Sequence, residues 1–453
     1  MFSDIIVIGG GAAGLAAACG AARTLVDAGS AARVTVLEKM PRPGRKIMIT
    51  GKGRCNFTNV KDWNAFSAHI RTNPNFLKPS FYNFTPSEAL DFFSALGMQS
   101  VVERGDRAYP ASHHASDVVD ALVRACHGAG VKIETEVEVK SVGPGLEVVA
   151  SDGRKWTCSR LIIATGGMSY PTTGSTGDGY RFAEESGHTV TPLFPSLTAL
   201  VPRGYKLVET KDLHIDRSTP LSELGKALCG VQLKNVGVQL LVEGSEAQSE
   251  FGDIDFTDGG IEGPVGFQLS RKAVKALVNG SRVALVLDLK PGVDLTELTV
   301  RIKALWEEIG KDPRSRGVRE KERCRILLGK LMPRELIPGF MLMHPGILTL
   351  ERRGRADTKV WVNLVSIAKA LKAWQFDIAG YVGYERAVVT AGGVSTDDFV
   401  AKTMESRLVP GLYLCGEVLD IDADTGGYNL QLAFATGALA GRSAAKSLVT
   451  NDD

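Results

Sequence analysis

The stretch DIIVIGGGAAGLAAACGAARTLVDAG, residues 4–29, constrains the fold more than any other part of the 453-residue chain. An apolar run typical of a strand ends at a glycine loop, and the loop opens directly into an alanine-rich segment typical of a helix. Residues 33–38 (RVTVLE) then have the pattern of a second strand. A G-x-G-x-x-G loop in this β-α-β context predicts an α/β fold with a Rossmann-like dinucleotide-binding domain.

Each glycine of the loop has its own expected role. Gly9 permits the tight turn, Gly11 lets the backbone approach a pyrophosphate, and Gly14 allows the helix to pack closely on the strand. The helix N-terminus directs its free N–H groups at the phosphate charge. Glu38 ends the second strand, where a carboxylate accepts hydrogen bonds from a ribose 2′-hydroxyl and disfavours a 2′-phosphate.

NAD and FAD share this fingerprint, so other stretches must distinguish them. Three carry the argument: GRKIMITGKGRCNFTN (44–59), LIIATGG (161–167) and LYLCGEVLDIDADTGGYNLQLAFATGALAG (412–441). In the last, Glu417 is placed to hold ribityl hydroxyls, and the N–H groups near Tyr428–Gln431 to stabilise negative charge on a reduced flavin. A plain NAD dehydrogenase does not need this remote segment, so the sequence predicts non-covalently bound FAD.

Charge and composition argue against several partners. A formal charge of +2 creates no field that attracts nucleic acid or an anionic membrane, and acids interrupt the basic stretch 311–325. No apolar run reaches the length of a membrane span, and no signal-peptide pattern precedes the glycine loop. We expect a cytoplasmic protein with a small-molecule substrate, no nucleic-acid partner and no membrane partner; the oligomeric state stays open.

The cysteines and histidines indicate neither a disulfide framework nor a metal site. Seven cysteines are scattered without a C-x-x-C pair, and the seven histidines lack metal-ligand spacing. For Cys55, packing or flavin contact is favoured over redox catalysis because no second cysteine neighbours it. His113 and His114 are assigned a solvated or capping role.

Other segments outline the domains. In FTPSEALDFFSALG, Thr85 and Glu88 form the pattern of a helix-capping box, with Pro86 at the first helical position. We expect an inserted β-rich and helical domain over 189–384, with residues 1–188 and 385–453 forming the FAD domain. Within the insert, residues 294–310 and 357–374 are predicted to be helical.

Nearly the whole chain resembles the bacterial BaiN-like NAD(P)/FAD-dependent oxidoreductases, or aminoacetone oxidase family FAD-binding enzymes. The resemblance rests on the motifs above and on three further segments: RAYPASHHASDVVDAL, ATGGMSYPTTGSTGDGYRFAEESG and GPVGFQLS. The resemblance implies a glutathione-reductase-like FAD domain built from both chain ends, an inserted β-barrel-like domain and a small helical domain. Two segments depart from the family pattern: the GKGRCN loop at Lys52, and residues 257–266, where Asp258 and Glu262 replace a histidine and a serine.

The resemblance also implies a set of cofactor-binding residues. The pyrophosphate and adenosine side comprises Gly9, Gly11, Ala12, Ala13, Gly14, Glu38, Lys39, Arg45 and Lys46. The ribityl and isoalloxazine side comprises Thr50, Gly51, Arg54, Cys55, Asn56, Thr165, Gly166, Gly167, Gly416, Glu417, Gly427, Tyr428, Asn429 and Leu430. No metal ligand is expected, and the sequence identifies no catalytic acid or base.

Several functions fit this sequence. The leading hypothesis is an FAD-dependent oxidoreductase that acts on a small organic compound, such as an unsaturated ring or enone, with NAD(P)H as a transient electron donor that lacks its own G-x-G-x-x-G loop. The alternatives are an oxygen-dependent amine oxidase of the aminoacetone type, an acceptor reductase of the fumarate reductase or ketosteroid dehydrogenase kind, and a non-catalytic flavin-binding redox sensor.

Overall fold

The computed structural model describes residues 1–208, 212–353 and 357–450. The chain divides into two compact units, one formed by Met1–Pro195 with Ala387–Asp453 and the other by Ser196–Arg386. The first unit extends to Pro195, beyond the expected boundary at 188, because strand β11 (Phe194–Ser196) pairs with β20 (Val389–Ala391).

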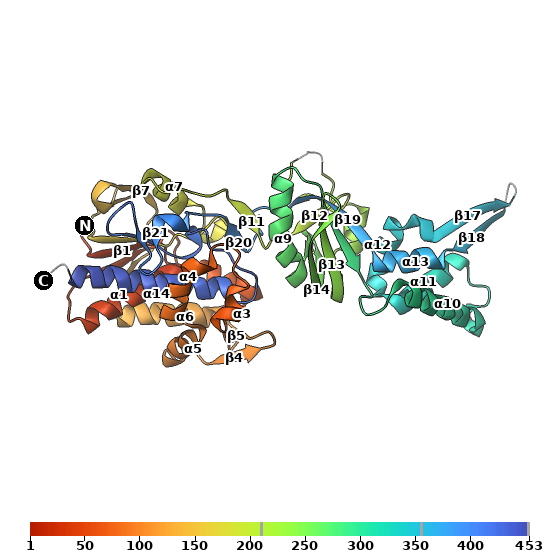
Figure 1. The fold of residues 1–453 in the computed structure, drawn as a ribbon, viewed down its shortest axis with the longest axis horizontal. Helices are drawn as coiled ribbons and strands as arrows, with labels where there is room; N and C mark the ends of the chain where they lie inside the picture. Colours follow the sequence, from red (N-terminus) through yellow and green to blue (C-terminus); the bar gives the residue numbers. More distant parts are fainter. Residues whose placement is uncertain (209–211, 354–356, 451–453) are drawn as a thin grey trace. The chain divides into compact units, whose positions relative to one another are not determined.

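A seven-stranded sheet forms the centre of the first unit (Figure 1). Its strands, in spatial order, are β21 (Phe399–Val400), β22 (Glu405–Ser406), β23 (Leu412–Leu414), β10 (Arg160–Ile163), β1 (Ile5–Ile8), β2 (Val34–Leu37) and β6 (Lys132–Glu134). The five strands from β23 to β6 are parallel to one another. Strand β22 runs antiparallel to β23, and β21 runs antiparallel to β22. Every residue of β1 and β2 is buried, and both strands therefore consist of apolar residues apart from one threonine.

Two long helices pack side by side along this sheet: α1 (Ala12–Asp27) and α14 (Tyr428–Val449) (Figure 1). Their contact depends on glycine. A Cβ added at Gly437 would lie 2.2 Å from the Ala13 carbonyl oxygen, and one at Gly441 would lie 1.9 Å from that of Ala17. The N-terminal and C-terminal parts of the chain therefore form one domain, as the resemblance implied.

Shorter elements complete the first unit. The helices are α2 (Arg45–Ile49), α3 (Trp63–Ser67), α4 (Pro74–Asn83), α5 (Pro86–Ala95), α6 (Ala115–Gly128) and α7 (Asp178–Glu185). The small sheets comprise β3 (Thr58–Asn59), β5 (Arg107–Pro110) and β4 (Ser100–Glu103), and β7 (Val139–Gly143), β8 (Glu147–Ala150) and β9 (Lys155–Trp156). The capping box of α5 is confirmed: the Thr85 hydroxyl accepts from the N–H of Glu88, and the Glu88 carboxylate accepts from that of Thr85.

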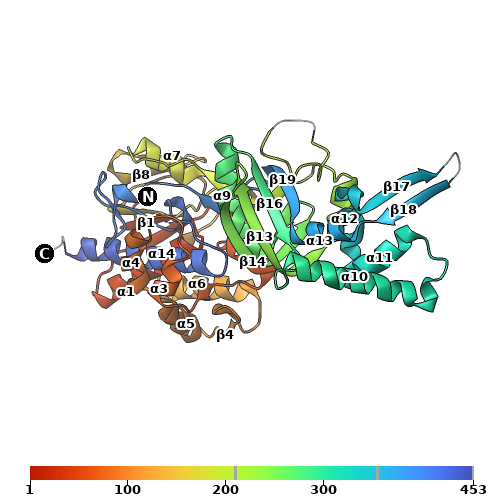
Figure 2. The ribbon, with the colours of Figure 1, turned by 45° about the vertical axis from the view of Figure 1, so that its right-hand side comes forward.

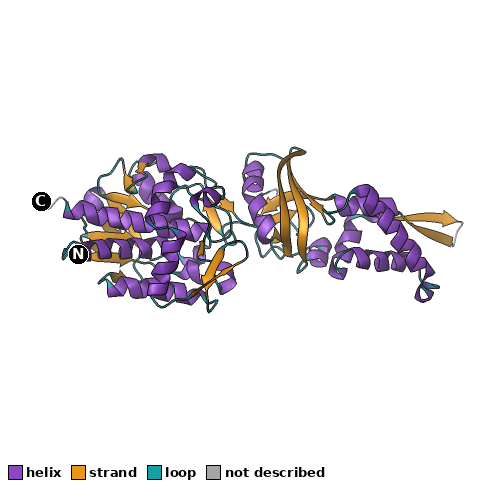
Figure 3. Ribbon diagram, turned by 60° about the horizontal axis from the view of Figure 1, so that its bottom comes forward, coloured by secondary structure: helices purple, strands orange, loops and turns teal. Residues whose placement is uncertain are grey.

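The second unit contains a closed six-stranded barrel, which confirms the barrel-like insert (Figures 2 and 3). In spatial order its strands are β12 (Leu200–Pro202), β15 (Gly260–Glu262), β14 (Ser245–Thr257), β13 (Gln232–Val242), β16 (Val283–Asp288) and β19 (Trp374–Tyr381). Helix α9 (Gly263–Val278) follows β15 and packs on β14.

The rest of the second unit is largely helical. It comprises α8 (Glu223–Leu228), α10 (Leu295–Lys311), α11 (Glu320–Leu331), α12 (Ile337–Met343), α13 (Leu364–Lys372) and the hairpin strands β17 (Leu348–Arg353) and β18 (Asp357–Val362). The helix expected over 357–374 is wrong in its first part, because β-branched and aromatic residues there favour a strand. Asn363 then caps α13 by accepting from the N–H of Ser366. No helix in the described part of the chain is long and apolar enough to cross a membrane.

Candidate functional site

The glycine loop joins β1 to α1 at the carboxyl end of the parallel strands. Gly9 has a φ of +103°, and a Cβ there would lie 2.5 Å from the Ala164 carbonyl oxygen. A Cβ at Gly14 would lie 1.8 Å from the Gly9 carbonyl oxygen, so this glycine lets α1 approach the strand. At Gly11 nothing lies within 4 Å of the Cβ position. The open side of the loop is where a pyrophosphate would reach the free N–H groups of α1.

Glu38 follows β2 and lies directly beside the loop, with 8% of its surface exposed. Its Oε2 accepts from the N–H of Gly10 at 2.6 Å, and its Oε1 from that of Met40 at 2.8 Å. Burial raises the pKa of Glu38, although these two hydrogen bonds and the charges of Lys39 and Arg45 oppose the rise. A carboxylate oxygen has more than one acceptor position, so Glu38 retains capacity for ribose hydroxyls.

An ion pair connects the two ends of the chain at the site. The N–H of Gly44 donates to the carbonyl of Gly10 and brings the start of α2 beside the glycine loop. From α2, Lys46 Nζ contacts Glu417 Oε2 at 2.7 Å, and Glu417 Oε1 accepts from the N–H of Thr390 at 2.8 Å. Glu417 is therefore fixed between α2 and β20, with about one fifth of its side chain exposed.

The segments that follow β10 and β23 converge on the same place. Thr165–Gly167 follow β10, and a Cβ at Gly167 would lie 2.5 Å from Thr390 Oγ1. After β23, Gly416 has a φ of +77°, and its Cβ would lie 2.6 Å from that of Ala13 in the first turn of α1. Small residues here let three chain segments meet around the loop. The predicted Thr165, Gly166, Gly167, Gly416 and Glu417 thus lie in one region.

Asn56 carries an unsatisfied acceptor. Its Nδ2 donates to the carbonyls of Thr58 and Ala108, both at 2.9 Å, which fixes the orientation of the amide. Its Oδ1 is buried and has no hydrogen-bond partner among the described residues. Gly427 lies beside it, since a Cβ there would be 3.0 Å from Asn56 Nδ2. Buried polar atoms need partners, and the N3–H of an isoalloxazine is a donor of the required kind.

Cys55, next to Asn56, is suited to packing rather than to redox chemistry. The residue is fully buried with a φ of +54°. Burial raises the pKa of its thiol to about 12, so the nucleophilic thiolate is scarce at neutral pH. The preference for packing or flavin contact over redox catalysis agrees with this environment.

Two predicted cofactor-binding cations already have protein partners. Arg54 lies over the Tyr109 ring, 4.5 Å from its centroid, and forms an ion pair with Glu103. Lys39 Nζ contacts Asp178 Oδ2 at 2.6 Å. Both side chains are held at the rim of the site by these contacts, and a cofactor would have to share them.

The start of α14 supplies the last predicted residues. The Tyr428 ring is buried, with Phe66 at 4.9 Å between centroids, and burial raises the pKa of its hydroxyl to about 12. The Asn429 amide exchanges hydrogen bonds with the backbone of residues 423–424, so it fixes the loop before the helix. Leu430 packs against the core of the first unit.

A three-residue polar cluster beside Tyr428 escaped the sequence analysis. His69 Nδ1 lies 3.0 Å from Asp424 Oδ2, and Arg71 Nε donates to Asp424 Oδ1 at 2.7 Å. The His69 ring stacks on Tyr428 at 4.3 Å between centroids and 20° between planes. His69 and Asp424 are 355 positions apart, and His69 lies in none of the quoted motifs, whereas Asp424 lies in the 412–441 segment without a role assigned to it. Only the acidic character of the loop before α14 gave a signal.

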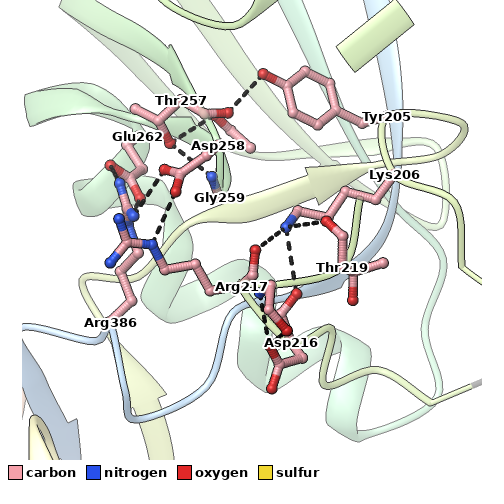
Figure 4. Close-up of polar contacts among 12 residues, drawn as sticks. Tyr205, Lys206, Asp216, Arg217, Thr219, Thr257, Asp258, Gly259, Glu262 and Arg386 are labelled. Atoms are coloured by element: carbon pink, nitrogen blue, oxygen red, sulfur yellow. Dashed lines mark hydrogen bonds and ion pairs between the residues drawn. The ribbon is translucent and has the colours of Figure 1, made fainter. Parts of the chain in front are cut away.

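In the second unit, Asp258 and Glu262, which replace a histidine and a serine of the family pattern, belong to an ion-pair cluster (Figure 4). Arg386 contacts Asp258 Oδ1 at 2.9 Å and Glu262 Oε2 at 3.0 Å, and Arg217 contacts Asp258 Oδ2 at 2.9 Å. Burial acts to raise the pKa of Asp258, but the Arg217 hydrogen bond and the charges of Arg386 and Arg217 lower it overall. The nearby Lys206 donates to three backbone carbonyls. Both acids are therefore charge-compensated within the barrel.

The residues of the first unit fit FAD. Gly11 leaves room for the pyrophosphate, Glu38 lies at the ribose position, and Asn56 offers an acceptor that has no partner among the described residues. Glu417, held by Lys46, and the first turn of α14 complete the set of residues expected to meet the cofactor. No group of three or more potential metal ligands occurs within the part of the chain that the structure describes.

Comparison with known proteins gives the family. The model of the HI0933-like protein Rossmann domain matches residues 3–443. A 3-dehydro-bile acid delta(4,6)-reductase of Clostridium scindens is 33% identical over 443 residues, which cover 97% of this chain and 98% of the relative. Ribosomal RNA dihydrouridine synthases of Haemophilus influenzae and Escherichia coli are 32% and 31% identical, each over 96% of both chains. The chain thus belongs to the HI0933-like family that the BaiN-like motifs indicated, and is an FAD-dependent oxidoreductase.

Proposed function

We propose that this enzyme reduces a ring carbon–carbon double bond conjugated to a carbonyl group, with NAD(P)H as the electron donor. The observation that carries the proposal is the chemistry named in its full-length relatives. One is named for reducing Δ4,6 double bonds of a 3-dehydro bile acid, and two for making dihydrouridine in ribosomal RNA. Each product has lost a ring double bond next to a carbonyl, although the substrates are unrelated in shape.

The site supports this reaction class. Bound and reduced, FAD supplies a hydride to an electron-poor carbon, and the protein must orient the substrate and supply a proton. The Asn56 Oδ1 atom would hold the isoalloxazine edge, and the first turn of α14 would favour the negative charge of the reduced ring. The thiol of Cys55 and the hydroxyl of Tyr428 keep their protons at neutral pH.

The donor would bind transiently, without a second fingerprint loop. The glycines of VTAGGV (389–394) serve backbone packing: a Cβ at Gly392 would lie 2.2 Å from the Pro192 carbonyl oxygen, and one at Gly393 would lie 2.7 Å from the Leu419 carbonyl carbon. Neither faces the open space that Gly11 faces. NAD(P)H would then reduce the flavin and leave before the substrate enters, which suits a site that both molecules use in turn.

We favour a free small molecule over RNA as the substrate. In the basic stretch 311–325, three of the seven cations form ion pairs with its own acids: Arg314 with Asp312, Arg323 with Glu320, and Arg325 with Glu322. RNA binding rests mainly on uncompensated positive charge, and the whole chain carries a formal charge of only +2.

The test is an anaerobic titration of the FAD-loaded protein with NADPH and then NADH, followed at the visible flavin band. The proposal expects bleaching by one of them, and recovery of the band when 4-androstene-3,17-dione, a cyclic enone, is added. A uridine-containing oligonucleotide is tested in parallel as an acceptor. Faster recovery of the flavin band with the oligonucleotide would show that RNA, and not a free small molecule, is the substrate. A band that no nicotinamide bleaches, together with hydrogen peroxide released from aminoacetone, would establish an oxidase instead. Flavin inert to every donor and acceptor would indicate a redox sensor.

A further inference from the structure

Reduction of a conjugated double bond needs a proton donor as well as a hydride, and most polar groups around the flavin end cannot serve. Cys55 has no exposed surface, and Tyr428 is 3% exposed. Asn56 carries no acidic proton, and Glu417 is held by Lys46 and by the N–H of Thr390. The donor has to be a partly exposed group that can release a proton and regain one from solvent.

His69 satisfies this requirement by its placement. It lies in the connection between α3 and α4, and one third of its side chain is exposed. Asn56 adjoins Gly427, Tyr428 follows in the chain, and the imidazole of His69 stacks on the Tyr428 ring. This series of contacts connects His69 to the residues expected to hold the isoalloxazine.

The partners of His69 orient its ring. Asp424 Oδ2 lies 3.0 Å from Nδ1, and Asp424, with 4% of its side chain exposed, is fixed in turn by two contacts from Arg71. A carboxylate at Nδ1 selects the tautomer with the proton on Nδ1 and leaves Nε2 as the atom that exchanges protons. Nε2 has no hydrogen-bond partner in residues 1–208, 212–353 or 357–450.

The backbone around the cluster is also fixed. Ile70 forms a bridge with Ala423, Arg71 N–H donates to the Asp422 carbonyl, and Asp424 N–H donates to the His69 carbonyl. These backbone hydrogen bonds hold residues 69–71 against residues 422–424, so the imidazole of His69 and the carboxylate of Asp424 keep their relative positions. The charged groups around the ring are Asp424 and Arg71, with Asp106 and Arg107 near the adjoining Tyr428 hydroxyl.

We propose that His69 is the proton donor of the reduction. The hydride lost by the reduced cofactor forms a C–H bond at the carbon β to the carbonyl, and the double-bond electrons shift toward the carbonyl. His69 Nε2 then gives its proton to the α-carbon, so the substrate gains two electrons and two hydrogens. Solvent returns a proton to His69, whose positive charge Asp424 stabilises before the transfer. This inference rests on the proposed function.

The kinetic test uses His69→Asn and Asp424→Asn, with His127→Asn as the control because His127 is exposed on α6, remote in sequence from the cluster. FAD-loaded proteins are reduced anaerobically with dithionite and mixed with 4-androstene-3,17-dione across a pH series. We expect His69→Asn to slow reoxidation of the flavin about 10²–10⁴-fold and to remove the loss of rate at high pH. Asp424→Asn should give a smaller loss and a shifted pH limb, and the control should match wild type.

Other outcomes overturn the assignment in distinguishable ways. Reoxidation by His69→Asn with the wild-type rate and pH profile excludes a proton role. A variant that melts early, loses FAD and also reacts slowly with NADPH shows that His69 only maintains the fold. If wild type reacts with neither the enone nor a uridine oligonucleotide, the proposed function fails and the acid role fails with it.

A second readout does not depend on turnover. In ¹⁵N-histidine NMR spectra of the oxidised FAD-loaded protein, His69 should carry its neutral-form proton on Nδ1, and Asp424→Asn should weaken that preference. A neutral ring protonated on Nε2 would contradict the geometry of the assignment, even if the reductase activity itself were established.

Discussion

The contact between α1 and α14 gives a quantitative prediction for Gly437→Ala. The added Cβ would lie 2.2 Å from the Ala13 carbonyl oxygen, whereas real Cβ atoms essentially never come closer than 3.0 Å. The helix must therefore retreat by about 1 Å along a backbone-to-backbone contact that no side-chain rotation relieves. Overpacking of this kind costs about 1–3 kcal/mol, occasionally more, against about 1 kcal/mol gained in helix propensity.

The resulting net loss of up to about 2 kcal/mol would lower the melting temperature of the first unit by up to roughly 4–8 °C. Because Ala13 lies in the first turn of α1, the same displacement should weaken FAD binding by up to about 30-fold. Thermal melts of the apo and FAD-loaded protein, with a fluorescence titration of FAD, measure both effects.

Gly128→Ala is the matched control. It makes the same change near the end of helix α6, where nothing lies within 4 Å of the Cβ position, so it should be neutral or stabilise by up to about 1 kcal/mol. If Gly437→Ala melts as high as this control and binds FAD normally, the close helix contact does not determine the shape of the cofactor loop.

Three further predictions concern single side chains. Glu38→Ala should weaken FAD binding about 10–100-fold in a titration, with Glu38→Gln less affected, because the ribose loses a charged acceptor; unchanged affinity would remove the ribose role. Asn56→Leu should slow flavin reduction in stopped flow and also lower stability by about 1–3 kcal/mol, since two buried carbonyls lose their donor; normal reduction kinetics would exclude a flavin contact. Burial lowers the pKa of His188, so this residue contributes to the free energy of unfolding above its ordinary pKa, and the contribution is lost as pH falls through the lower folded-state pKa. His188→Gln should therefore flatten the decline in melting temperature from pH 7 to 5. An equally steep decline in the variant would show that other groups cause it.

The sequence predicted most reliably what local patterns determine. The β-α-β start depends on a strand, a glycine loop and a helix that are consecutive in the chain, and the Thr85–Glu88 capping box spans four residues. The strand over 357–362 was missed because the short segment DTKVWV runs directly into a helix without a glycine or proline between them. The residue pattern alone did not distinguish the two-residue period of a strand from the 3.6-residue period of a helix.

Contacts between remote segments were beyond sequence reasoning. Lys46 and Glu417 were each assigned to the cofactor, but nothing in the sequence indicated that they pair with one another across 371 positions. The His69 and Asp424 pair lies on connecting segments whose path depends on the packing of α3, α4 and α14. A chemically important pair can therefore be missed when one member, His69, lies outside every motif and the other, Asp424, lies in a motif without an assigned role.

Single-turnover product analysis tests the central claim most directly. The FAD-loaded protein is reduced anaerobically with one equivalent of NADPH, mixed with 4-androstene-3,17-dione, quenched, and examined by mass spectrometry. We expect a product with two added hydrogens and an intact carbonyl, in an amount that matches the flavin reoxidised. Reoxidised flavin with unchanged steroid, or a steroid reduced at a carbonyl, would contradict it.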